Sequence, residues 1–175
     1  HFRTITDGPC LAFQYVQVGQ ENSFAWPRIG PGLDYQVHAV DSLAKAGKAT
    51  VQTLAESGRW FKERFPVTPA TAVTALEDPK AAGRKSVWFD SRFYRANLLW
   101  NGGRFGFRDI HLFDERFESD YLRRPGTSTQ CFYATLPLVD GFNWSTATDT
   151  AGLYLAAADA QGRIVPVPTG DPEVS

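Results

Sequence analysis

The feature that most constrains this chain is an aromatic-rich segment, residues 86–114, interrupted by Asn101-Gly102-Gly103. Asn-Gly or Gly-Gly between aromatic runs is typical of a tight hairpin, because glycine adopts positive φ without steric cost. The pattern predicts a β-hairpin whose two-residue loop is Asn101-Gly102 or Gly102-Gly103. Since the loop fixes how the strands pair, it also predicts which side chains share a face.

One predicted face of this hairpin mixes aromatic rings with charged and polar groups, and the other face is not simply polar either. We therefore expect the hairpin to lie between two layers of the fold. The side chains expected on the mixed face are Trp88, Asp90, Arg92, Tyr94, Ala96, Leu98, Trp100, Phe105, Phe107, Asp109, His111 and Phe113.

The rest of the chain alternates short apolar stretches with Gly- and Pro-rich turns, a pattern typical of short strands. Residues 19–32 are expected to form a long loop, and residues 114–124 one or two helical turns. The fold class predicted is mostly β, an antiparallel β-sandwich or jelly-roll-like domain with one or two short helices. The further strands expected are residues 10–18, 33–40, 70–76, 131–139, 151–157 and 163–167.

Residues 41–65 allow two interpretations. Apolar residues and glycines recur there at helical spacing, and Asp41 or Ser42 could cap such a helix. Yet Gly47 and Gly58 also fall where a meander of strands would turn. Each glycine inside a helix would cost about 1 kcal/mol relative to alanine. We favour the meander, with strands at residues 49–55 and 60–67, because the glycines fall where its turns are needed.

Composition fits a single domain, residues 1–175, which is either whole or a module of a larger protein. The net charge of −1 gives no reason to expect a nucleic-acid partner, and no apolar run reaches the roughly 18 residues that span a bilayer. The chain begins at His1 and has no Met, so we expect a processed product or a fragment, secreted or periplasmic. Cys10 and Cys131 allow either one disulfide or two thiols.

The main candidate site is a cluster of four side chains on the mixed face. Arg92, Tyr94, Asp109 and His111 are expected to be cross-strand neighbours that bind a polar ligand. Asp109 and His111 are also the candidate catalytic pair for acid–base chemistry. The structural alternative is a buried network in which Arg92 pairs with Asp109 and His111 bonds to Tyr94.

Two tryptophans complete the ligand-binding candidates, and a group of carboxylates is a further candidate for catalysis. Trp100 and Trp144 are expected to be exposed, where their rings could stack on sugars. Paired carboxylates are the tools of glycoside hydrolysis, although charges that flank a short helix are usually solvated. The acidic group comprises Asp109, Asp114, Glu115, Glu118 and Asp120.

The chain has only three histidines, His1, His38 and His111. An N-terminal histidine can chelate copper through its amino group and ring, with a second histidine completing a brace, as in lytic polysaccharide monooxygenases. These three residues are therefore the alternative metal ligands. We otherwise expect no metal and no cofactor.

Four phrases within residues 65–155 carry a resemblance: FPVTPATAVTALEDP, SVWFDSRFYRANLLW, FRDIHLFDE and LPLVDGFNWS. They resemble an uncharacterised β-rich module of bacterial polysaccharide-degradation proteins. The resemblance implies a carbohydrate context and a larger parent protein, and it carries over no catalytic residue.

The function expected is a carbohydrate-associated binding or accessory domain of a bacterial glycan-processing system. Its partners would be a poly- or oligosaccharide and a catalytic domain of the same parent protein. Three alternatives stay open: a glycan hydrolase or lyase that uses Asp109 and His111, a copper oxidase that uses His1, and a purely structural domain that packs on a catalytic partner.

Overall fold

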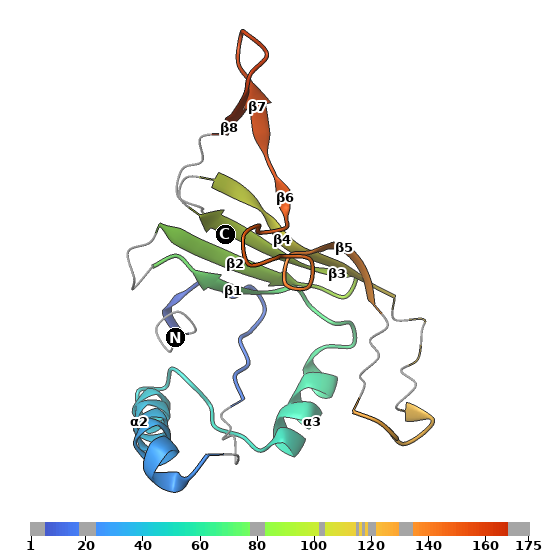
Figure 1. The fold of residues 1–175 in the computed structure, drawn as a ribbon. Helices are drawn as coiled ribbons and strands as arrows, with labels where there is room; N and C mark the ends of the chain where they lie inside the picture. The colour runs from blue at the N-terminus through green and yellow to red at the C-terminus, as the bar shows by residue number, and fades with distance from the viewer. Residues whose placement is uncertain are drawn as a thin grey trace.

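The computed structural model describes residues 6–17, 24–77, 83–101, 104–114, 116, 118, 122–129 and 135–167. At its centre is an antiparallel sheet with the strand order β1-β2-β3-β4-β5, and β6 pairs with β4 as well. Two helices lie beyond the β1 edge of this sheet, and a β7–β8 ribbon projects from its other side (Figure 1). The elements are α2 (Trp26–Lys45), α3 (Leu54–Arg64), β1 (Thr71–Ala75), β2 (Arg84–Asp90), β3 (Tyr94–Asn101), β4 (Arg104–Phe113), β5 (Thr135–Asp140), β6 (Leu153–Tyr154), β7 (Ala156–Ala158) and β8 (Ile164–Pro166).

The helices correct three predictions. The expected strand at residues 33–40 lies inside α2, the expected loop at residues 19–32 contains the start of α2, and the favoured meander at residues 41–65 contains α3. Proline at the beginning of α2 does not oppose the helix, because the first N–H groups have no intrahelical partner. Gly47 forms a turn with φ 69°, whereas Gly58 lies inside α3, so only one of the two glycines ends a helix.

A capping box explains why α3 forms despite Gly58. The Thr53 hydroxyl accepts a hydrogen bond from the backbone N–H of Glu56, and the Glu56 carboxylate accepts one from the backbone N–H of Thr53. The sequence Thr53-x-x-Glu56 is the signature of this cap. The local signal at residue 53 therefore outweighs the cost of one exposed glycine.

The N-terminal segment connects the sheet to α3. Leu11 forms an isolated bridge with Thr71 at the β1 edge, which is all that the described residues keep of the strand predicted at residues 10–18. Two residues further, the Phe13 ring packs against Trp60 and Phe65 at centroid distances of 5.4 Å. This aromatic contact holds α3 near the edge of the sheet.

The predicted hairpin is present, and its first strand differs from the prediction at the N-terminal end of β3. Asn101 pairs with Arg104, so the loop has two residues, Gly102-Gly103, as one of the two predicted registers requires. The long first strand is broken by a turn at Ser91, whose backbone N–H donates to the Tyr94 carbonyl at 2.9 Å. The chain therefore reverses twice, and β2, β3 and β4 form a meander.

A bulge in β4 moves the polar residues to a face that the alternation did not predict. Leu98 pairs with Phe107 but Asn97 pairs with Asp109, so Arg108 is an extra residue on β4. One inserted residue exchanges the faces of everything beyond it. Asp109 and His111 consequently share a face with Asn97 and Arg95, and not with Arg92 and Tyr94 as predicted.

The predicted fold class, mostly antiparallel β with two helices, is confirmed. The two facing sheets of a sandwich are not confirmed, because the described strands form one large sheet and the small β7–β8 ribbon. Among the described residues the buried hydrophobic side chains are only Ala72, Val87 and Ala96. Most large apolar side chains in the described ranges are therefore at least partly exposed.

Two more predicted strands are present, and other predictions concern residues outside the described part. The strands predicted at residues 70–76 and 163–167 correspond to β1 and β8, and a turn with Gly162 at φ 76° precedes β8. Residues 131–134 and most of residues 115–121 lie outside the described part. Cys10 is a free thiol, and Cys131 also lies outside the described residues. No helix in the described ranges is long and apolar enough to cross a membrane.

Candidate functional site

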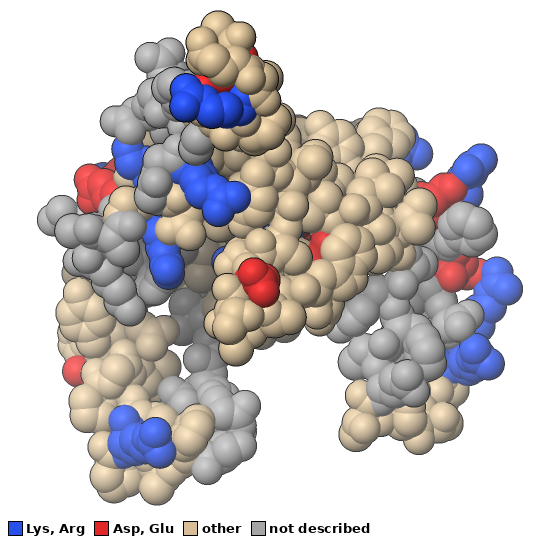
Figure 2. All heavy atoms as spheres, turned by 45° about the horizontal axis from the view of Figure 1, so that its top comes forward, with Lys and Arg blue, Asp and Glu red and all other residues tan. Residues whose placement is uncertain are grey.

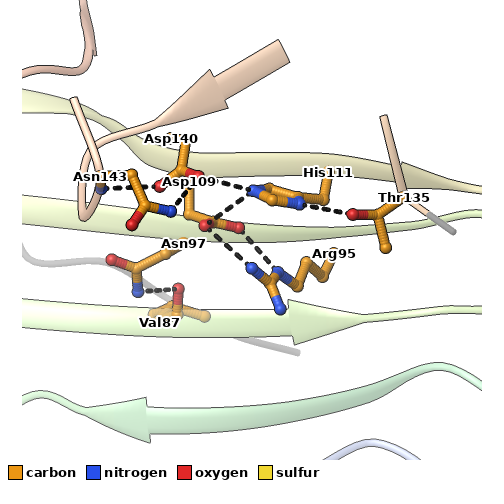
Figure 3. A network of polar contacts seen from close by, with 8 residues as sticks. All are labelled: Val87, Arg95, Asn97, Asp109, His111, Thr135, Asp140 and Asn143. Carbon is orange, nitrogen blue, oxygen red and sulfur yellow. Dashed lines mark hydrogen bonds and ion pairs between the residues drawn. The ribbon is translucent and has the colours of Figure 1, made fainter. Parts of the chain in front are cut away.

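One row of side chains crosses the sheet on its polar face. Trp88, Asn97, Asp109 and Asp140 pair in register across β2, β3, β4 and β5. The Arg108 bulge is what places Asp109 in this row, because without it Asn97 would face residue 108. Figure 3 shows the polar contacts that the row makes with its neighbours.

Among the residues that the structure describes, Asp109 is the most deeply buried charged group, with 0% of its surface exposed. The Arg95 guanidinium donates to both carboxylate oxygens, from Nε at 2.9 Å and from a terminal nitrogen at 3.2 Å. Arg95 in turn lies over the Trp88 ring, 5.9 Å from its centroid. A buried carboxylate requires such a partner, since unpaired burial of a charge is costly.

His111 lies between two carboxylates. Its Nδ1 contacts the Thr135 hydroxyl at 3.2 Å, and its Nε2 lies 3.4 Å from Asp109 Oδ2 and 3.7 Å from Asp140 Oδ2. The residue is only 8% exposed, and Nε2 has no hydrogen-bond partner. The Thr135 contact fixes the orientation of the ring, so Nε2 is directed at the two aspartates (Figure 3).

Asp140 ends β5 and is held by the loop that follows it. The Asn143 amide donates to Asp140 Oδ2 at 2.6 Å and the Asn143 backbone N–H to Oδ1 at 3.0 Å. Both bonds lower the pKa of the Asp140 carboxyl, and the bond from the Asn143 side chain has the larger effect. The nearby His111 lowers this pKa further. Asp140 is therefore a carboxylate at neutral pH.

The loop after β5 folds back over the sheet. The Phe142 ring stacks on Trp88 with 5.9 Å between centroids, and the Arg108 guanidinium lies 3.9 Å from the Phe142 centroid. Gly141 allows this return, because a Cβ there would meet the carbonyl oxygens of Arg108 and Ala151. The loop thereby covers Trp88, the neighbour of Asn97 in the row.

The cluster offers two kinds of chemistry. Asp109, His111 and Asp140 each provide one ligand atom, all within 4.8 Å of one another, and these three residues could hold a metal ion. Acid–base catalysis favours a carboxyl group whose pKa is raised toward the working pH, and Asp90 on β2 has a raised pKa. Burial raises the pKa of Asp90, Arg95 opposes this and Asp109 adds to it.

The structure separates the four residues predicted to cluster. Asp109 and His111 are neighbours, as predicted. The partner of Asp109 is Arg95 and not Arg92, and the partner of His111 is Thr135 and not Tyr94. Tyr94 packs against Phe89 instead. Arg92 lies in the turn after β2, where its guanidinium is 5.5 Å from the Phe93 ring.

Trp144 is 53% exposed, as expected, while Trp100 is partly buried against Phe105 at 4.7 Å. His38 lies on the exposed side of α2, where Asp34 raises its pKa, and is not part of the cluster at His111. His1 lies outside the described residues.

Of the three described members of the predicted acidic group, Asp109, Asp114 and Glu118, only Asp109 belongs to the site. Hydrogen bonds from Arg116 hold the pKa of Asp114 at about 2, and Glu118 is paired with Arg123. Glu115 and Asp120 lie outside the described residues. The expectation that charges flanking this segment are solvated fits the exposed Asp114 and Glu118 pairs.

A second feature, which the sequence did not suggest, is an open hollow of about 460 Å³ beside the hairpin end. Amide, guanidinium, carboxylate and hydroxyl groups surround it. Arg104 packs over the Tyr154 ring at 4.6 Å, so one aromatic wall is fixed in place. The lining residues are Asn101, Arg104, Thr148, Asp149, Thr150, Ala151, Gly152 and Tyr154.

Comparison of the chain with protein-family models, with curated proteins and with solved structures found no match. The resemblance to a module of polysaccharide-degradation proteins therefore stays a prediction, and function is inferred from the site itself.

The residues that sequence reasoning missed are Arg95, Thr135 and Asp140. Arg95 comes to the site through the β4 bulge, and Thr135 and Asp140 come through the pairing of β4 with β5, whose strands are separated by residues 114–134. The signal that could have found Asp140 is its position at the end of a strand and before Gly141. The bulge itself has no sequence mark.

Proposed function

We propose that this protein is a carbohydrate-associated binding or accessory domain, whose ligand is a poly- or oligosaccharide bound along the loop between β5 and β6. The observation that carries the proposal is the make-up of this loop and its hollow. Trp144 and Phe142 are 53% and 50% exposed, and Asp149 and the threonines of the same loop line the hollow.

These groups match what a sugar offers. The apolar face of a sugar ring packs on an aromatic side chain, while its hydroxyls need both donors and acceptors. Arg104 and Asn101 supply donors to the hollow, and Asp149 supplies acceptors. A volume of about 460 Å³ is within the usual range for small-ligand sites.

The buried cluster supports the loop rather than touching the ligand. Asp140 holds Asn143 through two hydrogen bonds, and Trp144 is the next residue. Because Asp109 and His111 are buried, they are not available to sugar hydroxyls in this conformation. We therefore assign them to positioning of the aromatic loop.

The test is a glycan array followed by calorimetry with paired variants. We expect Trp144→Ala to weaken binding by about tenfold or more, which corresponds to ~1.4 kcal/mol. Asp149→Asn should also weaken it, because Asp149 loses acceptor capacity toward hydroxyls.

Trp26→Ala and Asp34→Asn are the matched controls, since Trp26 and Asp34 are exposed on α2, away from the loop. Unchanged affinity in both loop variants, or equal losses in the controls, would remove this surface from consideration. An array without any glycan ligand would reject the proposal as a whole.

A second candidate, a domain that packs on a neighbouring domain, is favoured by the amount of apolar surface. Leu136 and Leu138 on β5, 59% and 53% exposed, are among many large hydrophobic side chains that the described residues leave uncovered. Figure 2 shows a large uncharged surface on this face, interrupted by a few carboxylates near the middle, with Lys and Arg mostly toward the edges of the view. Exposed apolar surface of this kind is typical of interaction sites.

A further inference from the structure

We propose that Asp109, His111 and Asp140 form a binding site for a single divalent transition-metal ion of the Zn²⁺ type. The site lies under the loop after β5 and does not depend on carbohydrate binding. The inference starts from one unusual atom, His111 Nε2, which is buried, has no hydrogen-bond partner and is directed at two carboxylates.

The spacing of the donor atoms fits a metal better than a hydrogen bond. Nε2 lies 3.4 Å from the Asp109 oxygen and 3.7 Å from the Asp140 oxygen. A hydrogen bond from nitrogen to oxygen is about 2.7–3.2 Å long. Two donors bound to one tetrahedral Zn²⁺ at about 2.0–2.1 Å lie about 3.3 Å apart. His111 Nε2 is therefore separated from each carboxylate oxygen by about the distance that an ion bound between them needs.

The groups behind the donors also fit. A metal-bound histidine usually engages its other ring nitrogen in a hydrogen bond, and here Thr135 contacts Nδ1 at 3.2 Å. Asn143 holds Asp140, and Arg95 holds Asp109. Each carboxylate keeps further lone pairs for a metal, because a carboxylate has about four acceptor positions.

The donor set indicates the class of ion. One imidazole nitrogen with two carboxylate oxygens suits Zn²⁺, Co²⁺ or Mn²⁺. Ca²⁺ takes six to eight oxygen ligands and Mg²⁺ keeps several waters, which three buried protein donors do not provide for. The charge balance agrees, since two aspartates and one arginine leave a net negative charge when His111 is neutral.

The test is metal titration of the full chain carrying His1→Ala, which removes chelation by the N-terminal histidine. We expect one equivalent of Zn²⁺ to bind and to raise the unfolding temperature. Co²⁺ should give the visible absorption of a tetrahedral nitrogen–oxygen site. His111→Gln and Asp140→Asn should abolish both effects, whereas His38→Gln, the matched control on α2, should leave them unchanged.

Two further measurements keep the proposal open to refutation if a ligand variant does not fold. Thr135→Val removes only the hydroxyl at Nδ1 and should weaken Zn²⁺ binding about tenfold. X-ray absorption on the Zn²⁺-loaded His1→Ala protein should show one imidazole with oxygen ligands. The proposal is overturned if the His1→Ala protein does not bind Zn²⁺, including the case in which only the parent chain binds it. A sulfur ligand in the absorption spectrum would also overturn it.

Discussion

Replacement of Arg95 by methionine tests whether the buried polar row is a true ion network. The change leaves Asp109, which is 0% exposed, without its two charge-assisted hydrogen bonds and close to Asp140. Removing one partner of a buried ion pair costs about 3–5 kcal/mol. The Arg95 side chain is itself 37% exposed, so we expect the lower end, about 3 kcal/mol.

The matched control is Arg163→Met. Arg163 pairs with Asp159 at 2.6 Å, but its side chain is 76% exposed. An exposed pair contributes about 0–1 kcal/mol, so this variant should differ little from the parent protein. The short distance alone would predict the opposite order, and the comparison separates distance from burial.

The assay is urea unfolding with a metal chelator present, because a bound cation would compensate Asp109. The urea concentration at the midpoint of unfolding should be lower for Arg95→Met, at a constant m-value. Adding Asp109→Asn to the Arg95→Met protein should restore part of the lost stability. A cost for Arg95→Met no larger than that for Arg163→Met would refute the reasoning. It would show that water reaches Asp109 in solution.

The other predictions concern local structure. Gly141→Ala should destabilise the protein by about 1–3 kcal/mol in urea unfolding, because its Cβ would meet backbone oxygens that have no freedom to move. Gly58→Ala is the opposite case, since nothing lies within 4 Å of that position, and it should stabilise α3 by about 1 kcal/mol; equal signs for the two glycines would contradict this account. Thr53→Ala should cost about 1 kcal/mol through loss of the capping box, measurable as reduced helix content on thermal unfolding. Hydrogen bonds from the backbone and side chain of Thr53 lower the pKa of Glu56. The stabilisation from the capping box is therefore fully present above the ordinary carboxyl pKa, and it is lost as pH falls through the lower pKa of Glu56 in the folded protein. A pH titration followed by circular dichroism should show this loss of helix in the parent protein and not in Glu56→Gln.

How far the sequence predicts this fold is clearest in the hairpin. Asn101-Gly102-Gly103 correctly predicts the turn and the pairing next to it, because a two-residue loop leaves little choice of register. The prediction fails at Arg108, where one extra residue exchanges the faces. A bulge depends on the packing of both strands, and no residue type marks it.

The helices fail for a different reason. Residues 33–40 alternate well enough for a strand, but the same residues continue a helix that begins at Trp26. Apolar alternation over few residues does not separate the two, and end signals decide. Pro27 and the capping box from Thr53 to Glu56 are such signals, and in the structure they outweigh the glycines at Gly47 and Gly58.

The candidate site was predicted in part. Asp109 and His111 are two residues apart on one strand, so alternation alone places them together. Arg95, Thr135 and Asp140 join them only through strand pairing across the bulge and with β5. Local pattern reveals neither a bulge nor the register of a strand that pairs across a long connection, here residues 114–134.

The most direct test of the proposed binding surface is the backbone amide spectrum of the isotope-labelled protein as an array-positive oligosaccharide is added. We predict that the largest shifts fall in the loop between β5 and β6 and at Asn101 and Arg104, with little change in α2. Shifts centred on α2, or on the turn at Arg92, would contradict the account.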